Sequence, residues 1–91
     1  MDTASQMAVK IIQEQETILG PVAVEQAKLV EGLEVVSGKD VKVTGDAKKV
    51  LENLVVQYEK LFGRASIEVC REAVRGIISQ APQEQIPSIL R

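Results

Sequence analysis

The sequence predicts an all-α domain of four helices, arranged as two copies of one helix-bend-helix unit. Apolar residues recur at spacings of three and four along much of the chain, which is the pattern of amphipathic helices. Residues 11–20 also align with residues 54–63, apolar on apolar at nearly every step, and each segment ends in glycine. We take the duplicated stretches as 7–36 and 50–79. Because one such unit is too small to bury its own apolar face, the two copies should pack together.

The first helix should begin at one of three residues suited to a helix N-cap, namely Asp2, Thr3 and Ser5. It should end at Gly20-Pro21, since the proline ring collides with the carbonyl four residues back and disfavours a helical residue before it. Proline also suits the first position of a new helix, so we expect a second helix from this point to about Val36.

A short β-hairpin is an optional feature of residues 35–43. The segment Ser37-Gly38-Lys39-Asp40 is typical of a turn, and β-branched valines flank it on both sides. An isolated two-stranded hairpin is weak in water, so the sequence leaves this element open.

The third helix should run from Ala47 to Phe62 with Asp46 as its cap, and a fourth from Ala65 to about Ser79. Gly63 separates them. One glycine inside a helix costs only about 1 kcal/mol, so a single long kinked helix is the alternative. The aligned position of the first copy carries Gly-Pro, which favours a break in both units.

The fourth helix has the widest apolar surface in the chain, covering roughly 220° at about 100° per residue. A helix of this kind is either the central helix of the monomer or the seam between two copies. A stripe of arginines alternating with Glu68 and Glu72 borders it, either as solvated intrahelical pairs or as pairs between subunits. The interface candidates are Arg64, Ile67, Arg71, Val74, Arg75 and Ile78.

Residues 81–91 are predicted to be a tail outside an all-α domain that comprises residues 1–80. Pro82 and Pro87 prevent a regular helix there, so we expect a frayed segment. Its apolar residues Ile86, Ile89 and Leu90 give an alternative, in which the tail docks into an apolar groove of its own chain or of a partner.

The residue types argue against catalysis. The chain has no histidine, the usual general base near neutral pH and the commonest nitrogen ligand for metals. Its single cysteine, Cys70, lies on the apolar side of the fourth helix, where we expect a packed thiol and not a nucleophile. We therefore predict no enzyme, no metal site and no cofactor.

Composition indicates one ordered domain. The chain has 91 residues, 45% of them hydrophobic and 26% charged, and a net charge of −2, which is not the basic footprint of a nucleic-acid-binding domain. No apolar run approaches the roughly 20 residues of a membrane-spanning helix, and no signal peptide is visible. A lone cysteine fits a reducing compartment. We expect a cytoplasmic protein without nucleic-acid or membrane partners.

The segment Ile18-Leu19-Gly20-Pro21-Val22-Ala23, set between two amphipathic helices, resembles small helix–Gly-Pro–helix modules appended to bacterial signalling proteins, including some serine/threonine kinases. The second copy reads Phe62-Gly63-Arg64-Ala65 and lacks the proline. The resemblance implies an interaction or oligomerisation module without catalysis of its own, and it carries over no functional residues.

These observations lead to one expected function and one alternative. The chain should be a non-catalytic protein-interaction or oligomerisation module in bacterial signalling or assembly, forming a homodimer or a higher homo-oligomer. The alternative is a sensor for a small apolar ligand, held between helices near Tyr58, Phe62 and Cys70.

Overall fold

The computed structural model describes residues 2–91 and contains four α-helices, one two-stranded sheet and three short 3₁₀ turns in that range. The helical elements confirm a mainly α-helical fold, to which the sheet is a small addition. In chain order the elements are α1 (Thr3–Leu19), α2 (Val22–Ala27), β1 (Leu33–Val35), β2 (Val41–Val43), α3 (Ala47–Phe62), α4 (Ala65–Val74), η1 (Ile78–Gln80), η2 (Gln83–Gln85) and η3 (Ser88–Leu90).

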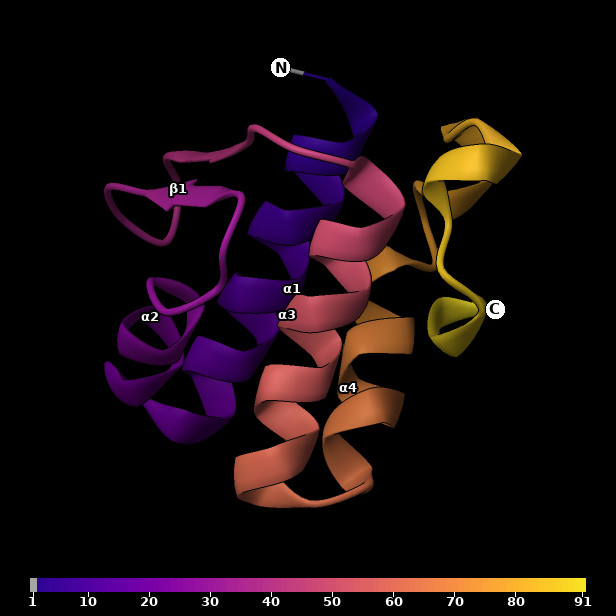
Figure 1. The fold of residues 1–91 in the computed structure, drawn as a ribbon. Coiled ribbons are helices and arrows are strands. Elements are labelled where there is room, and N and C mark those ends of the chain that lie inside the picture. Colours follow the sequence, from indigo (N-terminus) through magenta and orange to yellow (C-terminus); the bar gives the residue numbers. More distant parts are fainter. Residues whose placement is uncertain (1) are drawn as a thin grey trace.

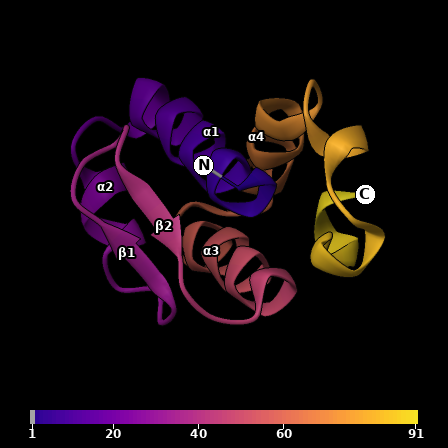
Figure 2. The same ribbon diagram turned by 90° about the horizontal axis from the view of Figure 1, so that it is seen from above.

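Helices α1 and α3 lie side by side at the centre and run in the same direction, so that both end at the bottom of Figure 1. Helix α2 packs on one side of this pair and α4 on the other, as the view from above shows (Figure 2). The hairpin lies on the α2 side, and the C-terminal 3₁₀ turns lie on the α4 side. Both helix bends therefore share one end of the molecule.

The core is aliphatic and comes from all four helices. Its completely buried side chains are Met7, Ala8, Ile11, Ile12, Ala23, Ala27, Leu51, Leu54, Val55, Tyr58, Cys70 and Val74. Helix α4 contacts α1, α3 and the C-terminal turns of the same chain. Of the two places that its wide apolar surface allows, the structure shows α4 packed inside the monomer.

Each central helix is ended by a glycine in the left-handed region. Gly20 has a φ of 73° and Gly63 a φ of 88°. The Gly20 N–H donates to the carbonyl of Glu16 at 2.8 Å, and the Gly63 N–H donates to the carbonyl of Glu59 at 2.9 Å. Glycine is favoured here because a side chain makes this conformation costly. The predicted break at Gly63 is confirmed, and the alternative of one continuous kinked helix is wrong.

Two buried hydrogen bonds link the units in a reciprocal way. The Tyr58 hydroxyl donates to the carbonyl of Ala23 at 2.6 Å, and Gln15 Nε2 donates to the carbonyl of Ser66 at 3.2 Å. In the alignment of the two segments, Gln15 corresponds to Tyr58 and Ala23 corresponds to Ser66. Each central helix thus binds the first turn of the second helix of the other unit.

Helix α2 ends at Ala27, well before the predicted Val36. The backbone turns at Gly32, whose φ is 85°, and a side chain there would begin 2.7 Å from Val50 Cγ2. Leu33 then pairs with Val43 in the sheet, which buries it. The chain after Ala27 thus runs through turns into the sheet and does not extend the helix. Helix α4 is also shorter than predicted, ending at Val74 in a series of turns.

The hairpin that the sequence left open at residues 35–43 is present, and its first strand starts two residues earlier, at Leu33. It is not isolated, because β2 packs against α1 and Ser5 Oγ accepts the Val43 N–H at 3.0 Å. Leu33 and Val41 face the core, and Glu34 and Lys42 face solvent. Packing against the helix gives this two-stranded ribbon the support that it lacks alone.

The expectation of a frayed tail at residues 81–91 is wrong. Ala81, Ile86, Pro87 and Leu90 are buried, and the turns η2 and η3 contact α3, while η3 also contacts α4. The prolines exclude a helix, as predicted, but 3₁₀ turns bring the apolar side chains inward. Of the alternatives, the tail docks into a groove of its own chain.

The left-handed glycines give a direct test of the bends. Gly63→Ala should destabilise the fold by about 1 to 2 kcal/mol, because alanine avoids this φ although nothing lies within 4 Å of the new methyl group. Urea unfolding measures the change. Gly76→Ala is the matched control, since its site is equally open and its φ is ordinary, so its free energy of unfolding should be unchanged or slightly raised. Equal losses at both positions would contradict this account.

Candidate interaction surfaces

Four large apolar side chains are exposed in the two bends. Ile18 is 61% exposed and Leu61 is 50% exposed, and Val22 and Phe62 beside them are also exposed. Both bends lie at one end of the molecule (Figure 1). Single apolar residues on a surface are ordinary, so these four are notable only because the bends that carry them share one end of the molecule. We call this surface the bend end, and its members are Ile18, Val22, Leu61 and Phe62.

The exposure of the bend end follows from the helix pattern. On α1, Ile11 and Gln15 point into the core, and Ile18 is the next residue on the same face. On α3, Leu54, Tyr58 and Leu61 repeat the arrangement. The chain reverses directly after Ile18 and after Leu61, so the following helix does not cover these two side chains. The apolar face of each central helix therefore extends beyond the core, to Ile18 on α1 and to Leu61 on α3.

The predicted interface residues of α4 line two adjoining hollows. Arg64, Ile67 and Arg71, with Ala65 and Glu68, line a hollow of about 360 Å³. Arg71 also lines the second hollow, of about 290 Å³, together with Arg75, Ile78, Leu90 and Arg91. Five of the six predicted residues are brought together in this way. Val74 is not among them, because it is completely buried in the core.

Leu90 and Arg91 were not among the residues predicted for this surface. They reach it because the tail docks against α4, which the sequence offered only as an alternative to fraying. The signal in the sequence was the set of apolar residues around Pro87, since a fully solvated tail gains nothing from them.

The intrahelical ion pairs expected along the arginine stripe are present. Arg71 Nη1 lies 3.0 Å from Glu68 Oε1, and the Arg75 guanidinium pairs with Glu72. All four groups are substantially exposed, so each pair contributes roughly 0.2 to 1 kcal/mol or less. These pairs leave most of the arginine donors available.

Two of the arginines also hold the tail in place. Arg71 Nε donates to the carbonyl of Ile89 at 3.0 Å. Arg91 Nη2 donates to the carbonyl of Gln83 at 3.1 Å. The arginine surface and the docked tail are thus one structural unit.

The three residues considered for an apolar ligand pocket line none of the three hollows found at α4 and at the base of the hairpin. Tyr58 and Cys70 are completely buried, and Phe62 lies on the bend end. The Cys70 Sγ accepts a hydrogen bond from Gln15 Nε2 at 3.4 Å. Burial raises the pKa of the Cys70 thiol to about 11, and burial likewise raises the pKa of Tyr58. Cys70 is therefore a protonated packing residue at neutral pH, with little nucleophilic character.

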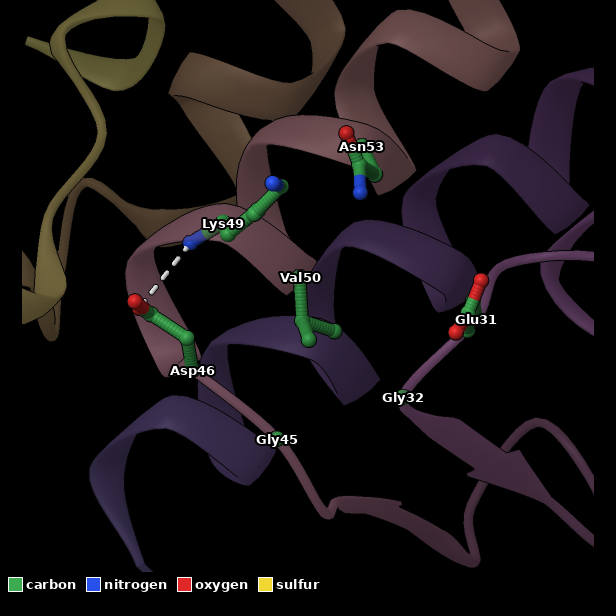
Figure 3. Close-up of a pocket in the computed structure, with 7 residues that line it drawn as sticks. All are labelled: Glu31, Gly32, Gly45, Asp46, Lys49, Val50 and Asn53. Atoms are coloured by element: carbon green, nitrogen blue, oxygen red, sulfur yellow. Dashed lines mark hydrogen bonds between the residues drawn. The ribbon is translucent and has the colours of Figure 1, made fainter.

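A third hollow, of about 310 Å³, lies between the base of the hairpin and the first turns of α3 (Figure 3). Gly32 and Gly45 form its backbone wall, and Val50 lies between them. The Asp46 carboxylate accepts the Lys49 N–H at 3.3 Å, the ordinary N-cap predicted for this helix. No group of residues suited to hold a metal ion occurs within residues 2–91. The hollow is explained as the junction of hairpin and helix.

No family model, curated protein or solved structure matches this chain. Within residues 2–91 no helix is both long enough and apolar enough to pass through a bilayer.

The buried thiol predicts a pH dependence of stability. Between the ordinary pKa of about 9 and the raised value of about 11, the unfolded chain loses the Cys70 proton and the folded chain keeps it. The contribution of Cys70 to the free energy of unfolding is thus fully present below about pH 9 and is lost as the pH rises toward 11. From pH 8 to 9.5 the loss should be about 1 kcal/mol in urea unfolding. Cys70→Ala should lose less over this interval, and an equal decline would contradict the assignment.

Proposed function

We propose that this protein is a non-catalytic interaction module that associates with a second copy of itself through the bend end. The observation that carries the proposal is the exposure of four large apolar side chains at the end where both bends lie. Burying such side chains in a contact contributes about 25 cal/mol per Å² of apolar surface. We propose a binding role and no catalysis. The one thiol is buried, and acidic and basic side chains form helix caps and surface ion pairs.

The partner that fits this surface best is another bend end. Ile18 and Leu61 occupy aligned positions, each two residues before a left-handed glycine, and Leu19 and Phe62 are aligned one residue before it. We interpret the two units as duplicates of one element, with the reciprocal hydrogen bonds as support. A face built from two similar halves is approximately self-complementary, as a twofold contact requires.

The proposed assembly is small and reversible. The bend end is one end of a molecule whose longest dimension is 30 Å, so its contact area is at the low end for protein interfaces. Such interfaces belong to transient complexes. The resemblance to helix–Gly-Pro–helix modules suggests bacterial signalling or assembly as the setting, and a buried free thiol fits the reducing cytoplasm.

Light scattering of variants tests the proposal. At tens of micromolar the protein should have twice the mass of one chain, and Leu61→Glu or Ile18→Glu should weaken the association at least tenfold, because each would bury a carboxylate without a partner. Leu29→Glu is the matched control, since Leu29 is even more exposed but lies after α2 and outside the bends. Its mass should be unchanged.

Two results would refute the assembly. One is a single-chain mass for the unaltered protein at this concentration. The other is dissociation by Leu29→Glu to the same degree as by Leu61→Glu, since the contact would then lie elsewhere. Circular dichroism of each variant establishes that it is folded, because all three substitutions are on the surface.

A further inference from the structure

The four arginines of the chain line two hollows that adjoin at Arg71. Arg64 and Arg71 line the first hollow, of about 360 Å³. Arg71, Arg75 and Arg91 line the second, of about 290 Å³. We call these two hollows together the arginine groove.

The groove is positive on a chain that is negative overall. The chain has 11 basic and 13 acidic residues, a net charge of −2. Glu68 is the one acidic residue that lines the groove, and Glu72 pairs with Arg75 beside it. Four guanidinium groups thus face two carboxylates, which leaves a local excess of positive charge.

Most guanidinium donors in the groove are unused. Each group carries five N–H donors. Arg71 uses its Nε toward Ile89 and its Nη1 toward Glu68, and its Nη2 donates to no residue in the described part of the chain. The Arg64 guanidinium makes no hydrogen bond or ion pair within residues 2–91, and only its backbone carbonyl is bonded, to the Ile67 N–H. These N–H groups can donate hydrogen bonds to carboxylates, whose two oxygens match the geometry of the guanidinium group.

Apolar side chains lie between the arginines. Ile67 lines the first hollow, and Ile78 and Leu90 line the second. Ile67 and Ile78 are half-buried, so part of each remains accessible to a partner. A partner of purely ionic character would leave these side chains in water. The surface matches a segment in which acidic and apolar side chains alternate.

We propose that the arginine groove is a docking site for a short acidic-apolar segment of a partner protein. Its carboxylates bind Arg64, Arg71 and Arg75, and its apolar side chains cover Ile67 and Ile78. This surface is separate from the contact between bend ends, except that Arg64 follows Gly63 directly. The second interaction would let a self-associated pair hold two partner segments.

A protein segment fits the groove better than nucleic acid does. Recognition of a phosphate backbone needs a basic domain, and here seven acidic residues in the first half repel a long polyanion. The groove is lined by residues 64–78 and by the end of the tail. The few arginines of the groove can pair with a few carboxylates of a short segment.

Fluorescence anisotropy with a labelled peptide of alternating glutamate and leucine tests this inference. The intact protein at low salt should bind the peptide, and binding should weaken as salt is added. Arg75→Glu should reduce the affinity at least fivefold, and so should Arg64→Glu. Arg71 and Arg91 are left unaltered, because they hold the tail. Lys39→Glu makes the same charge change on the exposed turn of the hairpin and should alter the affinity less than twofold.

Several outcomes would overturn the inference. These are no binding at low salt, equal binding of a peptide with glutamine in place of glutamate, and an equal loss for Lys39→Glu and Arg75→Glu. Tighter binding of duplex DNA than of the peptide would assign the groove to nucleic acid. The mass of Arg75→Glu in light scattering should stay that of the unaltered protein, so that failure of the groove and failure of self-association are distinguished.

Discussion

The architecture depends on two glycines that end the central helices in a conformation that other residues avoid. Gly20 and Gly63 each accept a left-handed φ and cap the helix before them, and each reverses the chain within two residues. Because α1 and α3 are parallel, both reversals fall at one end and place α2 and α4 on opposite sides. The buried hydrogen bonds from Gln15 and Tyr58 can form only with the second helices so placed.

This constraint also decides what stays exposed. The apolar face of α1 and of α3 extends to the last turn before the glycine. The next helix, α2 or α4, runs back from the bend and does not cover that last turn. Ile18 and Leu61 are therefore left at the surface by the same geometry that buries Gln15 and Tyr58. The docked tail has the opposite effect on α4, since η3 contacts that helix and Leu90 is buried there.

The sequence predicted correctly those helix ends that depend only on residues close to them in the chain. Asp46 caps α3 and Gly63 ends it because cap and left-handed glycine act within one helical turn. The end of α2 was misjudged because the chain after it enters a hairpin whose second strand packs on α1, a contact between distant segments. The same holds for the surfaces. Five residues of the α4 surface follow from helical spacing, whereas Arg91 joins it only through the fold of the tail.

The parallel course of α1 and α3 has a mechanical consequence. The N-terminal end of α1 lies opposite the bends (Figure 1), so any chain joined ahead of Asp2 leaves the molecule at its far end. Two copies in contact through their bends would point such attachments in opposite directions. The pair would then act as a rigid spacer, whose length is set by two helical bodies and not by a flexible linker.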